Sequence, residues 1–197
     1  MEHLEKRTDE QLVALYTDGN NSAFDILLER YKDKIYSYIF YSVRNADLAD
    51  DLFQETFVKA IMTIRQGRYT ENGKFGAWLS RIAHNLVIDV YRTERNECIV
   101  YGDDDNSEVF DNTSLTDAPI ENDMVNQQTL SDVKKLMDKL PENQREVVFM
   151  RFYQELSFKE ISDATGVSIN TALGRMRYAI LNMRKMANDN NLSLNIL

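Results

Sequence analysis

LSFKEISDATGVSINTALGRMRYAI, residues 156–180, contains two short amphipathic stretches that meet at a single glycine. The first stretch has the three-and-four spacing of a buried helix face, formed by Phe158, Ile161 and Ala164. Gly166 supplies the left-handed backbone conformation that ends a helix at low cost. Ser168 then caps a second helix, whose predicted buried side consists of Ala172, Met176, Ala179 and Met183. This spacing fits either a helix-turn-helix or an ordinary helical hairpin.

Charge favours the DNA-binding alternative. The chain has no acidic residue between Asp163 and Asp189, whereas Arg184 and Lys185 add to two earlier arginines. An acid-free basic helix is suited to phosphate contact, and the start of such a helix reaches base edges in the major groove. We predict phosphate contacts by the two earlier arginines and base contacts near the start of the helix. The predicted DNA-binding residues are Ser168, Asn170, Thr171, Arg175, Arg177 and Tyr178.

The net charge of -9 over 197 residues appears to conflict with DNA binding. The acids, however, are concentrated in two segments: residues 1–60 hold twelve acids and seven bases, and residues 99–126 hold eight acids and no base. Residues 61–98 have six bases against four acids, and residues 127–197 have ten against eight, a net of +2 in each case. Two weakly basic pieces predict weak DNA affinity that a larger partner supplements.

Composition restricts the class of protein further. Seven glycines, two prolines and few alternating β-branched residues predict a chain that is almost entirely helical. The single cysteine, Cys98, cannot form an internal disulfide and fits a reducing cytoplasm. The sequence shows no apolar run near eighteen residues and no signal-peptide pattern, so we expect a cytoplasmic protein without membrane insertion.

The segment that begins at Cys98 has no helical period and is rich in Asp, Asn, Ser and Thr, which is typical of a linker. Asp103, Asp104 and Asp105 suggest a metal site, but they lack the glycine and the distal glutamate of a calcium loop, so a solvated acidic run is favoured. The predicted fold is all-α: two small helical domains joined by a flexible acidic linker, the second ending in a helix-turn-helix. The predicted boundaries are 1–97, 98–126 and 127–197.

Helical periodicity divides the N-terminal domain into four helices. The first opens at Thr8 or Asp9, the second is capped by Ser22, and the third begins near Ala46. The loop GRYTENGKFGA, residues 67–77, precedes the last helix, WLSRIAHNLVIDVYRTER, residues 78–95.

Three blocks resemble bacterial sigma factors of RNA polymerase. They are DLADDLFQETFVKA, FGAWLSRIAHNLVIDVYR and LPENQREVVFMRFYQELSFKEISDATGVS. The order of the blocks and the two-domain length resemble the extracytoplasmic-function subgroup, which retains regions 2 and 4. The resemblance implies an initiation factor that binds core RNA polymerase, recognises the -10 and -35 promoter elements and aids promoter melting. It implies no cofactor, and none is predicted.

In this family the DDLFQETF helix binds the clamp helices of the polymerase largest subunit. The resemblance therefore assigns core polymerase binding to Asp50, Asp51, Gln54 and Glu55. Acids beside apolar Leu52 and Phe53 also suit a protein surface better than a phosphate backbone. A plain solvated face is the alternative, and Phe53, as an aromatic on the exposed side, argues against it.

The loop and the helix after it resemble the part of a sigma factor that opens and reads the -10 element. Unstacked bases of a melted strand stack on aromatic side chains and form hydrogen bonds with side-chain amides. The resemblance implies roles for Tyr69, Asn72, Lys74, Trp78, Arg81 and Asn85, with His84 in place of a usual basic neighbour. Phe75 and Trp78 are also consistent with simple core residues. Arg92 and Arg95 are further phosphate candidates, and Arg95 also fits a solvated helix end.

The -35 helix departs from the family pattern. Leu173 stands where a basic DNA-contacting residue is common, and it fits either contact with a thymine methyl or packing against another protein. Gly174 costs about 1 kcal/mol of helix propensity but allows close approach to a backbone. Many family members are held inactive by an anti-sigma factor, which makes such a protein a candidate partner.

Two other functions compete with this interpretation. A regulator that binds duplex DNA unaided would need a sensor or dimerisation domain, and residues 1–95 show no such pattern. An enzyme would need a phosphate loop, a nucleophile motif or a metal-ligand cluster, and the two histidines, His3 and His84, are far apart in sequence. The sequence favours the initiation factor, and a pull-down with core polymerase distinguishes it from the regulator.

Overall fold

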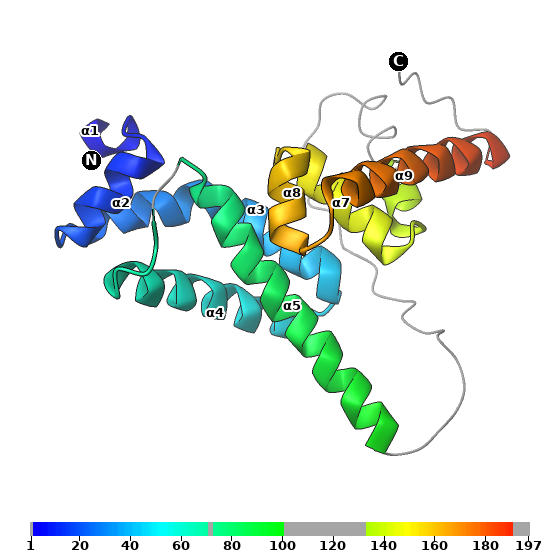
Figure 1. Cartoon of the computed structure of the whole chain (residues 1–197), viewed down its shortest axis with the longest axis horizontal. Coiled ribbons are helices and arrows are strands. Elements are labelled where there is room, and N and C mark those ends of the chain that lie inside the picture. The colour runs from blue at the N-terminus through cyan, green and yellow to red at the C-terminus, as the bar shows by residue number, and fades with distance from the viewer. Residues whose placement is uncertain (1, 71–72, 101–132, 191–197) are drawn as a thin grey trace, which may run out of the picture. The chain divides into compact units, whose positions relative to one another are not determined.

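The computed structural model describes the backbone of residues 2–70, 73–100 and 133–190, and the side chains of residues 4–70, 73–93 and 133–190. All of the regular elements in these ranges are helices, as the sequence predicts (Figure 1). The chain divides into two compact units. Residues 101–126 of the predicted linker, including Asp103 to Asp105, lie outside the described residues.

The N-terminal unit contains α1 (Glu2–Glu5), α2 (Asp9–Thr17), α3 (Asn21–Val43), α4 (Ala46–Arg65) and α5 (Phe75–Val100). Helices α3, α4 and α5 pack against one another, and α2 packs against α3. The apolar side chains at their interfaces are withdrawn from water, which is the main stabilising contribution to such a unit. The fully buried residues at its centre include Leu12, Leu27, Ile35, Ile39, Leu79 and Ala83.

Local capping explains most of the helix starts. Thr8 forms a reciprocal capping box with Gln11 at the start of α2, and the Asn45 side chain accepts from the Leu48 amide at the start of α4. The predicted cap at Ser22 is wrong. Gly19 turns the chain at φ +99°, Asn20 takes the extended cap conformation, and α3 already begins at Asn21.

Helix α5 is longer at both ends than the sequence predicts. It begins at Phe75, not Trp78, because the Trp78 amide already donates to the Lys74 carbonyl at 3.0 Å. The Phe75 side chain is buried at 1% exposure in the core of the unit. It ends at Val100, so Cys98 and the two residues after it are helical although they fall in the predicted linker.

The C-terminal unit is organised around α7 (Glu142–Phe152) and α9 (Ile169–Asp189), which pack against each other. The Asn182 amide donates to the Gln144 side chain at 2.8 Å and joins the two helices. The shorter α8 (Phe158–Thr165) precedes α9 in the chain. Buried residues of α7 and α9 include Val147, Val148, Met150, Ala172, Met176 and Ala179.

The predicted helix-turn-helix corner is confirmed. Gly166 ends α8 with φ +71°, a conformation that a residue with a side chain adopts only at a cost. Ser168 then caps α9, since its hydroxyl accepts from the Thr171 amide at 3.0 Å. Before α8, the Arg151 guanidinium donates to the Leu156 carbonyl and lies 5.3 Å from the centre of the Phe158 ring.

Candidate nucleic-acid and protein interfaces

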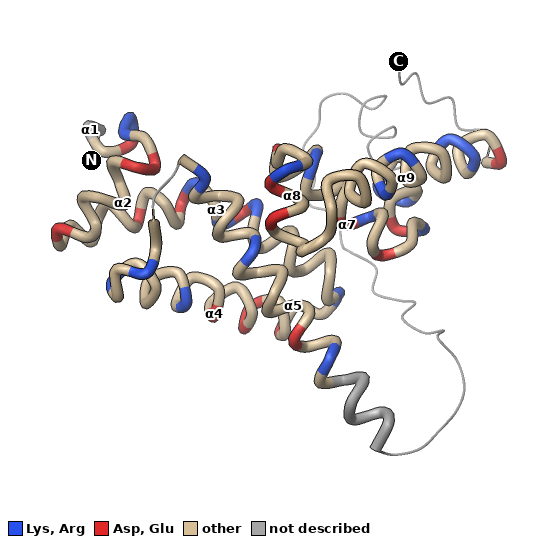
Figure 2. The backbone as a smooth tube through the Cα atoms, viewed as in Figure 1, with Lys and Arg blue, Asp and Glu red and all other residues tan. Residues whose placement is uncertain are grey.

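The four predicted polymerase-binding residues all lie exposed on α4. Asp51 and Glu55 are one turn apart, and Glu55 forms an exposed ion pair with Lys59 at 2.9 Å. Asp50 is nearer to α3, where it accepts a hydrogen bond from Tyr36. Burial raises the pKa of the Tyr36 phenol, and the hydrogen bond and negative charge of Asp50 raise it further. Figure 2 shows the acids of α4 in its first half and Lys or Arg in its second.

Phe53 is not the exposed aromatic that the sequence suggests. Its ring lies 5.8 Å from the ring of Tyr36 on α3 and 4.9 Å from that of Phe57, and it is half-buried. The exposed apolar residues of α4 are instead Val58 and Met62, at 52% and 53% exposure. They follow Asp51 at seven and eleven residues and so continue the same face of the helix. That spacing was the signal in the sequence that would have identified them.

The loop between α4 and α5, residues 66–74, ends in a cluster of aromatic rings. The Tyr69 ring lies 4.2 Å from the Trp78 ring and 5.9 Å from the Phe75 ring. Phe75 is buried, so the alternative that it is a core residue is correct, whereas Tyr69 and Trp78 are only half-buried. Lys74 is half-buried at the end of the loop, and Asn72 lies outside the described residues.

The first turns of α5 present a polar stripe beside these rings. Arg81 and Asn85 are exposed one turn apart, and Arg92 continues the stripe two turns later. His84 does not belong to it: its ring is 7% exposed, and its Nδ1 lies 3.0 Å from the Tyr38 hydroxyl on α3. His84 therefore joins two helices of the unit instead of facing DNA. No pattern in the sequence indicates that His84 pairs with Tyr38, which lies 46 residues earlier.

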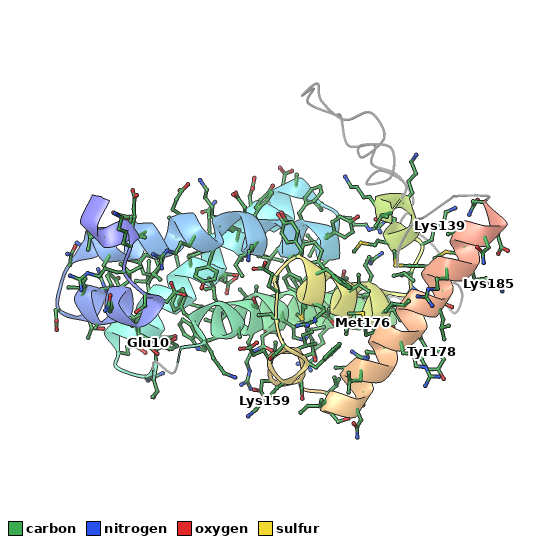
Figure 3. All side chains as sticks on the ribbon, turned by 90° about the horizontal axis from the view of Figure 1, so that it is seen from above. Glu10, Lys139, Lys159, Met176, Tyr178 and Lys185 are labelled. Atoms are coloured by element: carbon green, nitrogen blue, oxygen red, sulfur yellow. The ribbon has the colours of Figure 1, made fainter. Side chains whose placement is uncertain are left out.

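Helix α9 has an outer stripe on the side opposite its buried residues. Tyr178, at 61% exposure, and Lys185 project from it, whereas Met176 is buried (Figure 3). The helix carries basic residues and no acid before its C-terminal end (Figure 2). The outer stripe consists of Asn170, Gly174, Tyr178, Leu181 and Lys185.

The two arginines predicted to contact phosphates do not share a face of α9. Two residues advance a helix by about 200°, so Arg175 and Arg177 lie on nearly opposite flanks. Arg177 is exposed, and Arg175 is half-buried. Thr171 is exposed, but its hydroxyl lies 2.8 Å from that of Ser168, so both hydroxyls belong to the helix cap.

Gly174 and Leu173 face outward. A Cβ added to Gly174 would meet no atom within 4 Å, so packing inside the protein does not require the glycine. Leu173 is 43% exposed and lies on a flank of the outer stripe.

The three surfaces together define a class of protein. An acidic helix face suits a basic protein partner, stacked aromatics suit unpaired bases, and a basic capped helix suits a major groove. Together they describe a helical transcription protein that contacts both DNA and another protein. Among the described residues, no helix combines the length and apolar character needed to cross a bilayer. The same part of the chain brings no three metal-ligating side chains together.

Comparison with known proteins identifies the family. Residues 27–97 match Sigma-70 region 2, and residues 130–175 match Sigma-70, region 4. The extracytoplasmic-function (ECF) RNA polymerase sigma factor SigW of Bacillus subtilis is 30% identical over 179 residues, which are 87% of this chain and 92% of SigW. The ECF sigma factor BldN of Streptomyces coelicolor is 33% identical over 157 residues, 79% of this chain and 57% of BldN.

Two solved structures share the fold. CnrH, solved in complex with the cytosolic domain of CnrY, aligns with a TM-score of 0.62 and 22% identity, covering 93% of this chain and 99% of CnrH. The sigma factor RpoE of Bartonella quintana, solved with the anti-sigma factor NepR, aligns with a TM-score of 0.67 and 19% identity. The alignment covers 84% of this chain and 96% of that RpoE chain. The chain belongs to the sigma-70 family, in its extracytoplasmic-function group. It is a sigma factor that directs RNA polymerase to promoters.

Proposed function

We propose that this sigma factor uses three separate surfaces. The acidic face of α4 binds core polymerase, the α4–α5 loop with the start of α5 captures the -10 element, and α9 reads the -35 element. The observation that carries the proposal is the outer stripe of α9, which presents amide, glycine, phenol, leucine and lysine on a helix that has no acid before its last residue, Asp189. The domains proposed for these roles are residues 1–97 and 127–197 with a linker between them, with the first domain extended to Val100, where α5 ends.

The α4 surface suits a protein partner with positive charge. Asp51 and Glu55 are exposed and have an acidic neighbour in Asp50, so approach of a basic helix gains long-range attraction. Val58 and Met62 continue the face with apolar side chains that lose water on contact. The basic coiled coil of the polymerase clamp is the partner proposed for this face.

The α4–α5 loop suits an unpaired strand. Tyr69 and Trp78 are half-buried and pack on each other with ring centres 4.2 Å apart, and a base that stacks on this pair contributes about 1–3 kcal/mol. Arg81 and Asn85 stand beside them, the first able to contact a phosphate and the second to pair with a base edge. The unpaired strand is held after duplex opening, which makes opening of the -10 element favourable.

The outer stripe of α9 supports a division of roles at the -35 element. Asn170 lies near the start of the helix, where base edges are reached, and an amide matches the donor and acceptor of adenine. Arg175 and Arg177 lie on opposite flanks, so they contact the two backbones that border the groove, one arginine on each. Because phosphate contacts carry no sequence information, we expect the two arginines to determine the affinity for DNA and not the preferred -35 sequence.

Changing Arg177 to alanine should weaken holoenzyme binding at many promoters alike. The loss of one phosphate contact should reduce the slope of log affinity against log salt by about one unit. Asn170→Ala should instead change which -35 sequence is preferred. Promoter-library selection with each holoenzyme, at two salt concentrations, measures both effects. An altered sequence preference for Arg177→Ala, with an unaltered one for Asn170→Ala, would reverse the assignment.

Non-enzymatic action in the cytoplasm completes the proposal, since transcription initiation there needs binding energy and no catalytic group from this chain. An anti-sigma factor is a further partner, supported by the complex in which the Bartonella RpoE was solved with the anti-sigma factor NepR. A pull-down with core polymerase tests the proposal directly. A regulator acting alone would bind duplex DNA tightly and leave the polymerase in the unbound fraction.

A further inference from the structure

Helix α2 precedes the part of the chain that matches region 2, since that match begins at residue 27. It nevertheless packs against both α3 and α4 (Figure 1). Its nine residues span about 13 Å at 1.5 Å per residue. Residues in its last turn contact the end of α4, and residues in its first turn are connected to the start of α5.

The last turn of α2 holds the end of α4. The Arg65 Nε donates to the Tyr16 hydroxyl at 2.9 Å, and the guanidinium carbon lies 5.6 Å from the centre of the Tyr16 ring. Tyr16 is itself buried and packs on Phe24, with ring centres 4.9 Å apart. The last residue of α4, where the loop begins, is therefore attached to a fixed point.

The first turn of α2 is connected to the start of α5 through Tyr31, a residue of α3. Asp9 accepts from the Tyr31 hydroxyl and, at 2.6 Å, from Arg30. The Tyr31 ring packs on Phe75 with ring centres 5.4 Å apart. A Cβ on Gly76 would lie 2.6 Å from Cε1 of Tyr31, so the first turn of α5 meets the ring more closely than any side chain would allow.

Contacts with the loop itself complete the arrangement. A Cβ on Gly73 would lie 3.2 Å from Oε1 of Glu10, which is the second residue of α2 (Figure 3). Phe75, held by Tyr31, contacts both Tyr69 and Trp78, with ring centres 5.9 Å and 5.6 Å away. A continuous series of contacts thus runs from Asp9 to the two rings proposed to receive bases.

We propose that α2 positions the Tyr69 and Trp78 rings for strand capture, with the Asp9–Tyr31 hydrogen bond as its main positioning contact. This role rests on the function proposed for these rings. Side chains held in place beforehand lose less conformational freedom when they bind the strand, so less of the binding energy is spent on ordering them. Tyr31 is a positioning residue and has no contact with DNA in this role.

Tyr31→Phe tests the role because it keeps the ring on Phe75 and Gly76 but removes the hydroxyl that reaches Asp9. We expect the holoenzyme to form about fivefold fewer open complexes at a duplex promoter, which is the order of one lost hydrogen bond. Permanganate reactivity of melted thymines measures opening. Affinity for core polymerase and for a duplex fragment carrying only the -35 element should not change.

Tyr91→Phe is the matched control. It removes a tyrosine hydroxyl that joins two helices of the same unit: Tyr91 on α5 donates to the Ser42 carbonyl on α3, whereas Tyr31 on α3 donates to Asp9 on α2. Its holoenzyme should open the promoter normally. Asp9→Asn, which keeps an acceptor for Tyr31 but weakens the pairing with Arg30, should lie between Tyr31→Phe and the wild type.

The opening measured with these variants decides between the proposals. A loss of opening confined to Tyr31→Phe and Asp9→Asn supports the positioning role. Normal opening by Tyr31→Phe, or an equal loss with Tyr91→Phe or in core affinity, overturns it. Trp78→Ala separates the two proposals. Normal promoter opening by the Trp78→Ala holoenzyme overturns the function proposed for the loop as well as the positioning role. Impaired opening by Trp78→Ala together with normal opening by Tyr31→Phe overturns the positioning role alone.

Discussion

Reversing Asp51 and Glu55 to lysine should weaken the binding of core polymerase by about thirtyfold, or about 2 kcal/mol. Both side chains are exposed on one face of α4, so reversal converts attraction for a basic partner into repulsion without disturbing the core. The new lysine at position 55 faces Lys59 one turn away, which costs the helix only a few tenths of a kcal/mol. Competition against labelled wild-type chain for core polymerase measures the change.

Asp25→Lys with Glu29→Lys is a closely matched control. These exposed acids are also four residues apart on a helix, and Glu29 pairs with Lys32 at 2.8 Å much as Glu55 pairs with Lys59. Net charge therefore changes equally in the two double variants. An equal loss of affinity in both would indicate a general charge effect and contradict a specific α4 interface.

Gly174→Leu should have opposite effects on stability and on promoter binding. The protein leaves open space around this position, so leucine should raise the free energy of unfolding by about 1 kcal/mol through helix propensity alone. If the outer stripe enters a major groove, the added side chain meets the DNA backbone or bases. Promoter affinity of the holoenzyme should then fall by about tenfold or more. Thermal unfolding and a promoter-binding titration measure the two quantities.

Asn188→Leu supplies the comparison for this substitution. Asn188 is exposed on the same helix, fourteen residues and about 21 Å beyond Gly174, past the part of α9 proposed to enter the groove. The Asn188→Leu holoenzyme should bind promoters as the wild type does. Unchanged promoter affinity for Gly174→Leu would place the outer stripe away from DNA and favour a protein partner for Leu173 and Leu181.

Features set by neighbouring residues could be predicted from the sequence. The capping residues Thr8 and Ser168, the helix start at Ala46 and the left-handed Gly166 all depend on interactions within one turn. The prediction that Ser22 caps α3 was wrong because Asn20 and Ser22 have similar capping ability. The turn at Gly19 places Asn20 at the cap position. Local rules rank such candidates but do not include the path of the chain before the helix.

Features set by distant residues could not be predicted. Periodicity gives each helix an apolar side, but it does not say that Tyr36 covers Phe53 or that Tyr38 pairs with His84. The contacts of Asp9 with Tyr31 and of Arg65 with Tyr16 likewise join helices whose sequences carry no mark of pairing. The opposite flanks of Arg175 and Arg177 follow from helical geometry alone and could have been deduced from their spacing.

Transcript mapping with host core polymerase tests the central claim most directly. Core enzyme transcribes a genomic fragment library with and without this chain, and the 5′ ends of the transcripts are sequenced. We predict new 5′ ends that appear only with the chain and share two upstream sequence blocks at a constant spacing, while the chain alone retains little of the same DNA. Tight duplex binding by the chain alone, with no new 5′ ends when core polymerase is added, would contradict the account.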